Sequence, residues 1–286
     1  MVKVLSFLVV ISLIAAGSPP IPLQSEEFTT GLVSAAWDGS PTNEFSWGSA
    51  VSDDGRFVAF SSLASNLIPD DTNAVEDIFV YDRQTGLTER VSIAHNRDQA
   101  NGASLNPHIS ADGRYVVFNS AATNLVQTDA NGYADVFVFD RQSGTSEIIS
   151  VSSAGTQGNN SVFGDAPAIS PNGRFVSFGS YATNLIDGEQ PVDEHPDVFW
   201  RDRQTGETRC VSVTLSGEQG SEWSSKSDIS SDGRFVTFSS EATNLVYGDN
   251  NGQRDIFLRD RDVDGDGVYD EPGSVRTTRI SMGLSG

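Results

Sequence analysis

Short runs of successive apolar residues are the main pattern along this chain. Residues 57–60 (FVAF) and 78–81 (IFVY) are apolar at every position, whereas a strand with one wet face alternates apolar and polar residues. An Asp54-Gly55 turn signal precedes the first run, and RQTG follows the second. Neither run lies in a stretch with a helical period. The pattern predicts short strands in sheets that are covered on both faces.

The runs recur with a long and regular period. The block SDDGRFVAFSS at Ser52 returns in related form at Ser110, Ser170 and Ser230, at steps of 58, 60 and 60 residues. Each repeat contains several strand signals separated by turn residues. We therefore divide the chain into units at approximately 33–90, 91–148, 149–210 and 211–279, with a partial unit at 280–286.

Repeated sheets that are covered on both faces are typical of propeller blades. The period predicts an all-β protein, a β-propeller of about four four-stranded antiparallel blades over residues 30–286. The sequence leaves three arrangements open: a four-bladed ring, an open arc and a fragment of a larger propeller. An open arc would expose a strand edge and a blade face, and would favour self-association.

The repeated blocks carry a family resemblance. The pattern S-x-D-G-R-[FY]-V-x-F, followed by D-[IV]-F-x-x-D-R-x-[ST]-G, resembles the TolB-like, WD-repeat-like β-propeller repeats of secreted and periplasmic bacterial proteins. The resemblance implies a propeller that presents a binding surface, although a fold does not dictate a function. The sialidase Asp-box differs, because here Gly55 directly follows Asp54.

The N-terminus has the pattern of an export signal. Lys3 precedes an apolar run of 13 residues from Val4 to Ala16, and small residues lead to Gly17. The run is shorter than the ~20 residues that span a bilayer. We predict a signal peptide at 1–17, a linker at 18–29, and a secreted or periplasmic protein that is not inserted in the membrane after cleavage.

The charge and the cysteine content limit the classes of partner and of covalent cross-link that the chain can have. The chain has 18 basic and 39 acidic side chains, a net charge of -21, which excludes a nucleic-acid partner because phosphates require a positive surface. Cations and basic surfaces are the natural complement of this charge. Cys210 is the single cysteine, so no intrachain disulfide forms, and its alternating neighbours predict a strand residue.

The fourth unit contains an acidic insertion. Asp260 and Ile280 are twenty residues apart, whereas the corresponding residues of the other units are nine apart. Carboxylates at positions 1, 3, 5 and 9 of the insertion, with a carbonyl at position 7, match the first part of an EF-hand-type Ca²⁺ loop: Asp262, Asp264, Asp266, Asp270 and Val268.

The insertion departs from an EF-hand at position 12. Gly273 stands where the bidentate glutamate would be, and Glu271 lies at position 10. Glu271, Asp260 or water would supply the missing ligand. We predict a structural Ca²⁺ here, with a solvated acidic turn as the alternative.

A second oxygen-rich pattern occurs in three units, before the strand signal that ends in Asp-Arg. Oxygens at i, i+2 and i+6 would gather around a cation, and Asx-turns are the alternative explanation. The residues are Asp71, Asn73, Asp77, Asp129, Asn131, Asp135, Asp249, Asn251 and Asp255. The third unit has Pro191 and Asp193 instead of the first two.

These patterns favour a binding module over an enzyme. A catalytic site is normally single, so the Asp-Arg pairs that recur in every unit indicate structural bonds. We expect an exported, calcium-stabilised scaffold for an unidentified protein or glycan partner, and no catalytic residues. The alternatives are a carbohydrate-active hydrolase or lyase on a propeller, and a cell-surface repeat array.

Overall fold

A computed structural model describes residues 30–162, 164–186 and 195–281. The predicted signal peptide and linker, at 1–29, lie outside the described residues, as does most of the partial unit at 280–286. The chain divides into Met1–Leu32 and Val33–Gly286, and every strand belongs to the second part. The described residues contain no helix that is long and apolar enough to cross a membrane.

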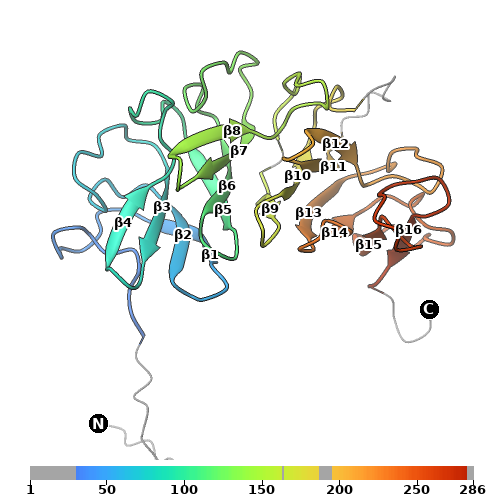
Figure 1. Ribbon diagram of the computed structural model, residues 1–286, viewed down its shortest axis with the longest axis horizontal. Coiled ribbons are helices and arrows are strands. Elements are labelled where there is room, and N and C mark those ends of the chain that lie inside the picture. The colour runs from blue at the N-terminus through green and yellow to red at the C-terminus, as the bar shows by residue number, and fades with distance from the viewer. Residues whose placement is uncertain (1–29, 163, 187–194, 282–286) are drawn as a thin grey trace, which may run out of the picture. The chain divides into compact units, whose positions relative to one another are not determined.

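In the described residues, sixteen strands form four four-stranded antiparallel sheets, which we call blades 1 to 4 in chain order (Figure 1). In each blade the strands follow one another as a meander, with consecutive strands paired. Their bounds are β1 Ser46–Val51, β2 Phe57–Ser62, β3 Asp77–Asp82, β4 Leu87–Arg90, β5 Ser104–Ile109, β6 Tyr115–Ser120, β7 Asp135–Asp140, β8 Thr145–Ile148, β9 Ala168–Ile169, β10 Phe175–Ser180, β11 Asp197–Asp202, β12 Glu207–Cys210, β13 Ser224–Ile229, β14 Phe235–Ser240, β15 Asp255–Asp260 and β16 Arg276–Arg279. This confirms the all-β fold of four four-stranded antiparallel blades.

The central strands of blades 1 to 3 are mostly buried on both faces, as their continuous apolar runs predict, whereas β15 of blade 4 exposes one face. In blade 1, Phe60 pairs with Phe79 across β2 and β3, and the rings stack with centroids 5.9 Å apart. Blades 2, 3 and 4 repeat this stacked pair at centroid distances of 6.3, 5.7 and 5.7 Å. The same register therefore places the same aromatic contact in every blade.

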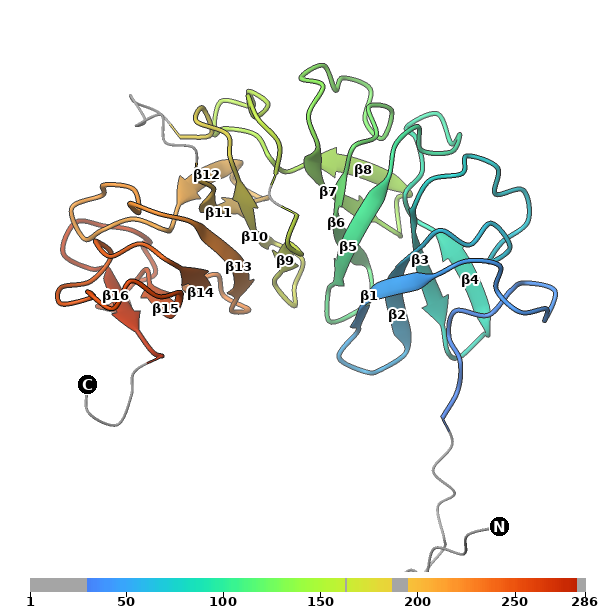
Figure 2. The ribbon, with the colours of Figure 1, turned by 180° about the vertical axis from the view of Figure 1, so that it is seen from behind.

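Within the described ranges, three hydrophobic core clusters lie between consecutive blades, and a fourth belongs to blade 1 alone. Figure 2 shows the blades following one another in chain order. Between blades 1 and 2, for example, Ile78 and Val80 belong to one cluster with Phe118 and Phe137. The equivalents of Ile78 and Val91 in blade 4 are Ile256 and Ile280, which are 41% and 51% exposed. The last blade therefore presents outward the apolar positions that the other blades bury.

A glycine of the repeated block allows neighbouring blades to approach. Gly113 has a φ of 72°, and a Cβ at this position would lie 2.1 Å from the ring of Phe57 in blade 1. Arg141 of blade 2 covers the same ring, with its guanidinium carbon 4.1 Å from the centroid. Only a residue without a side chain fits here, so the glycine is an inter-blade packing residue.

Candidate metal centre

The acidic insertion forms the connection between β15 and β16, and the carboxylate of Asp262 organises it. Its Oδ1 accepts hydrogen bonds from the amides of Gly265 and Asp266 at 2.9 and 3.1 Å, and its Oδ2 accepts one from Gly267 at 3.1 Å. Gly265 and Gly267 have φ values of 74° and 87°, a region that favours glycine. The tight turn expected from the spacing of aspartates and glycines is present.

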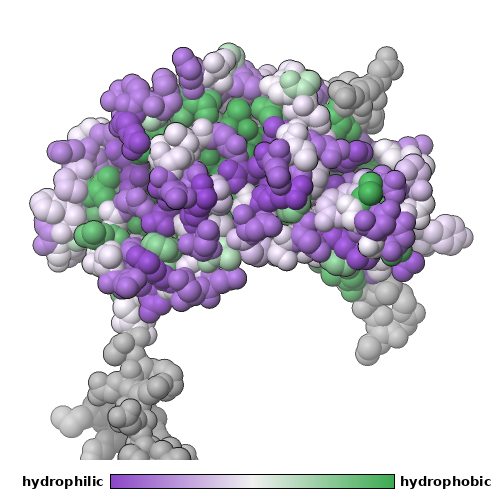
Figure 3. Space-filling model, in the orientation of Figure 1, coloured by the Kyte–Doolittle hydropathy of each residue, from purple (hydrophilic) through white to green (hydrophobic). Residues whose placement is uncertain are grey.

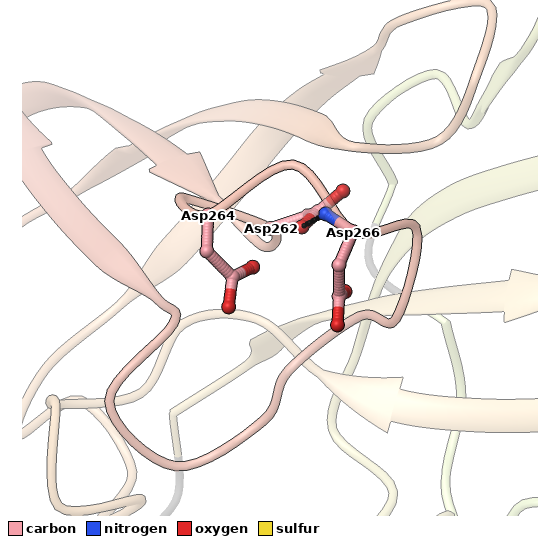
Figure 4. Close-up of side chains that lie close together, drawn as sticks. All are labelled: Asp262, Asp264 and Asp266. Atoms are coloured by element: carbon pink, nitrogen blue, oxygen red, sulfur yellow. Dashed lines mark hydrogen bonds between the residues drawn. The ribbon is translucent and has the colours of Figure 1, made fainter.

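Asp262, Asp264 and Asp266 offer carboxylate oxygens that all lie within 4.8 Å of one another. Asp264 and Asp266 point to the same side of the loop, with Asp262 between them (Figure 4). Asp262 is buried, while the other two are exposed. Ser274 donates to Asp264 at 2.7 Å, and this bond lowers the pKa of Asp264. The set of hard oxygen donors fits Ca²⁺.

Asp270, the predicted ligand at position 9, lies outside this group. Its carboxylate accepts two hydrogen bonds from Arg261, at 2.9 and 2.5 Å. Arg261 is fully buried, and its guanidinium carbon is 3.6 Å from the ring centroid of Trp200 in blade 3. Asp270 therefore anchors the loop to blades 3 and 4.

Val268 and Glu271, the two remaining candidates of the loop, are exposed. The amide of Val268 donates to Asp266 at 2.8 Å, and the carbonyl of Glu271 accepts from Ser274 at 3.0 Å. The structure thus gathers the carboxylates of positions 1, 3 and 5, and uses the later residues to close the turn.

In blade 1 an arginine lies among the oxygens of the second pattern. Nη1 of Arg90 is 3.0 Å from Asp71 and 3.1 Å from Asp77. The amide nitrogen of Asn73 donates to Asp77 at 2.8 Å, so Asn73 orients this carboxylate. Burial raises the pKa of Asp77, and Arg90 acts in the opposite direction.

Blade 4 has the same arrangement. Nη1 of Arg279 is 2.7 Å from Asp249 and 3.3 Å from Asp255, and Asn251 donates to Asp255 at 2.8 Å. In both blades a guanidinium occupies the position that the sequence left open to a metal. The sequence pattern did not predict these ion pairs. The arginine that ends the last strand is visible in the sequence, but its distance along the chain does not reveal which aspartates it contacts.

Blade 2 has Ile148 at the position of Arg90, since Ile148 pairs with Phe137 as Arg90 pairs with Phe79. Asn131 donates to Asp135 at 2.8 Å. Burial raises the pKa of Asp135 to about 6 and also raises the pKa of Asp129. Both oxygens of Asp129 are buried without a hydrogen-bond partner among the described residues. Pro191 and Asp193 of the third unit lie outside the described residues.

An open groove of about 630 Å³ lies between the loops after β12 and β14. Leu215 is 65% exposed, and Tyr247 is fully exposed. The face of the molecule shown in Figure 3 is mostly hydrophilic, with hydrophobic residues in separate patches. The groove therefore offers an aromatic and an aliphatic side chain to a partner.

No protein-family model matches the sequence, and neither does any curated protein. TolB from Acinetobacter baumannii is 16% identical, with a TM-score of 0.47, over 86% of this chain and 47% of that chain. The putative TolB from Agrobacterium tumefaciens is 17% identical, with a TM-score of 0.48, over 85% of this chain and 64% of that chain. The β-propeller domain of the trilobed protease from Pyrococcus furiosus is 10% identical, with a TM-score of 0.46, over 83% of this chain and 57% of that chain.

The four four-stranded antiparallel sheets fit a β-propeller. The likeness to solved structures concerns the fold alone, because the identities are low. This chain spans between 47% and 64% of the length of the three structures. The function of this propeller is therefore argued from its own residues.

Proposed function

We propose that this propeller is exported, is stabilised by calcium, and acts as a scaffold that binds a protein or a glycan. The observation that carries the binding role is the groove with Leu215 and Tyr247. A tyrosine ring buries a large apolar area and also offers a hydroxyl, so it suits the surface of a protein or a sugar. Export rests on the apolar run from Val4 to Ala16.

The repeated charged residues support a structural use of one carboxylate in each blade. In each blade, the arginine just before the second strand donates two hydrogen bonds to the aspartate that ends the third strand: Asp82, Asp140, Asp202 and Asp260. Bidentate bonds of this kind fix the relative position of two strands. A scaffold whose blades are held rigid can present its loops in one geometry.

Calcium would stabilise the hairpin that joins β15 and β16. Three carboxylates whose oxygens lie within 4.8 Å repel one another, and a divalent cation would neutralise them. The same loop is tied to blade 3 through Arg261 and Trp200. Binding of the ion would therefore hold the two blades beside the groove.

Binding assays with panels of immobilised glycans and of secreted bacterial proteins test this function. We expect saturable binding of at least one class, weakened by about tenfold or more in Tyr247→Ala, as for the central aromatic residue of an interface. Tyr133→Ala is the matched control, because Tyr133 is also an exposed loop tyrosine. An equal loss of binding in both variants would contradict the role of the groove as the binding site. Release of sugar products from the glycans would favour the carbohydrate-active alternative.

A further inference from the structure

Three blades contain the same polar pocket at the first residue of their third strand. In each, a serine hydroxyl donates to one oxygen of that aspartate at 2.5 Å, and an asparagine amide donates to the other at 2.8 Å. The aspartates are Asp77, Asp135 and Asp255. Because the three blades share these hydrogen bonds, their pockets can be compared residue by residue.

The pocket of blade 1 surrounds a cationic nitrogen with three oxygens. Nη1 of Arg90 lies 3.0 Å from Oδ1 of Asp71, 3.1 Å from Oδ2 of Asp77 and 3.3 Å from Oε1 of Gln99. In blade 4, Arg279 places its Nη1 between two aspartates in the same way. Two of the three pockets thus hold a cation that the chain itself supplies.

Blade 2 keeps the oxygens and lacks the arginine. Gln157 corresponds to Gln99: it donates to the carbonyl of Thr128 at 2.9 Å and accepts from the amide of Ala130 at 3.1 Å, as Gln99 donates to Asp70 and accepts from Thr72. The residue in the place of the arginine is Ile148, which brings no charge.

The carboxylate of Asp129 shows that this pocket lacks a partner. Both of its oxygens are buried and, in the described part of the chain, neither has a partner at hydrogen-bond distance and angle, although the residue as a whole is partly exposed and the nearby amide of Asn131 acts to lower its pKa. Asp135 beside it is 1% exposed. A buried carboxylate beside a second one whose oxygens are also buried is unfavourable without a counter-charge, since a buried charge needs an opposite charge or a metal.

We propose that blade 2 binds a calcium ion between Asp129 and Asp135, with Oε1 of Gln157 as a third protein oxygen. The ion takes the position that the guanidinium occupies in blades 1 and 4. Two carboxylates and an amide are hard oxygen donors, and Ca²⁺ accepts an irregular set completed by water more readily than Mg²⁺ does. Asn131 positions Asp135, because it is the amide nitrogen that faces the carboxylate. The site is separate from the acidic loop of blade 4 and does not depend on it.

Calorimetric titration with Ca²⁺ tests the site in the chain that carries Asp264→Ala/Asp266→Ala, which removes the acidic loop as a competitor. We expect one Ca²⁺ per chain. Adding Ile148→Arg abolishes this binding, because the new guanidinium fills the pocket. Ile148→Met is the matched control, because it is uncharged and similar in volume, and it keeps the ion.

The reverse exchange gives an independent readout. In the same chain, Arg90→Met removes the cation of blade 1 and leaves its oxygens in place. We expect a second Ca²⁺ per chain, bound in blade 1. Unchanged stoichiometry in a folded Arg90→Met chain would contradict the equivalence of the pockets.

Absence of Ca²⁺ binding by the Asp264→Ala/Asp266→Ala chain would overturn the proposal and would indicate that a proton is shared between the two carboxylates.

If Ile148→Arg does not fold, Asp129→Asn is the variant that replaces it in the titration, since it keeps the shape of the side chain and removes a ligand charge. We expect Asp129→Asn to weaken the affinity by more than about tenfold, and an unchanged affinity would overturn the site. Equal Ca²⁺ binding by the wild-type and Asp264→Ala/Asp266→Ala chains would refute only the calcium site in the acidic loop of blade 4.

Discussion

The guanidinium of Arg114 shows how a single repeated residue holds a blade together. Its Nε and Nη2 donate to the two oxygens of Asp140 at 2.9 and 2.7 Å, which joins the start of β6 to the end of β7. Asp140 also accepts a hydrogen bond from the amide of Gln142 at 2.9 Å. These bonds, that of Arg114 first, lower the pKa of Asp140 to about 2. The ionised carboxylate is therefore the form that the folded state favours.

This depressed pKa predicts a pH-dependent contribution to stability. The unfolded chain protonates an aspartate near pH ~3.9, so the contribution of Asp140 is complete above that pH and is lost as the pH falls toward about 2. Urea unfolding of the wild type and of Asp140→Asn measures it. We expect a difference of about 1 kcal/mol at neutral pH, modest because the pair is partly exposed, which shrinks between pH ~4 and ~2.

Glu44→Gln is the control for this measurement, because Glu44 is exposed. Its free energy of unfolding should follow that of the wild type at every pH. If the difference in unfolding free energy between Asp140→Asn and the wild type stayed constant down to pH ~2, protonation of Asp140 would not be linked to folding, and the prediction would be wrong.

At the scale of elements, one hairpin differs from its three equivalents. The connections from β3 to β4, β7 to β8 and β11 to β12 are short turns, whereas residues 261–275 join β15 to β16. The longer connection is held at Asp270 by Arg261, and the hydroxyl of Tyr269 donates to the carbonyl of Asp232 at 2.6 Å. Its three clustered aspartates make its stability sensitive to cations.

Thermal unfolding with Ca²⁺ and with excess EGTA measures the effect of the ion on this hairpin. Ligand that binds only the folded state raises stability by about 2.7 kcal/mol at a concentration of 100 Kd. We expect the melting temperature of the wild type to rise with Ca²⁺, and Asp264→Ala/Asp266→Ala to lose the part of the rise that the loop supplies. Glu44→Ala/Glu218→Ala removes two exposed charges elsewhere and should keep the full rise. Equal rises in all three proteins would argue against the loop as a metal site.

At the scale of the whole molecule, the blades bury one another and the last one presents its apolar face outward. Ile78 and Val91 of blade 1 are fully buried against blade 2, whereas Ile256 and Ile280 are 41% and 51% exposed. The three existing interfaces show what fits such a face: the aromatic face of another blade. We propose that a second copy of this chain covers it.

Sedimentation equilibrium tests this association. We expect a concentration-dependent increase in mass that is lost in Ile256→Lys, because a lysine on the covered face would have to be desolvated. Leu87→Lys is the control, since Leu87 is 69% exposed at the start of β4 and away from the face of blade 4. A monomer at all concentrations, or equal dissociation by both variants, would refute the association.

Local patterns along the sequence determined the blades and the shape of the acidic turn. Apolar runs of four residues bounded by turn signals predict strands that are buried on both faces, and the stacked phenylalanines of β2 and β3 lie in two of these runs. The aspartate and glycine spacing likewise determined the turn around Asp262, because its bonds join residues three to five apart. Such contacts depend on neighbours in the chain, so a single sequence reveals them.

The partners of the charged side chains, by contrast, depend on how distant strands meet in the folded blades. Asp270 binds Arg261 instead of joining Asp262, and Arg90 reaches Asp71, which is 19 residues away. The spacing of aspartates is the same in blades 1, 2 and 4, yet a residue on the last strand determines whether a guanidinium or an unpartnered carboxylate results. Burial and pairing arise where distant strands meet, so the chemistry of each pocket depends on the folded blade.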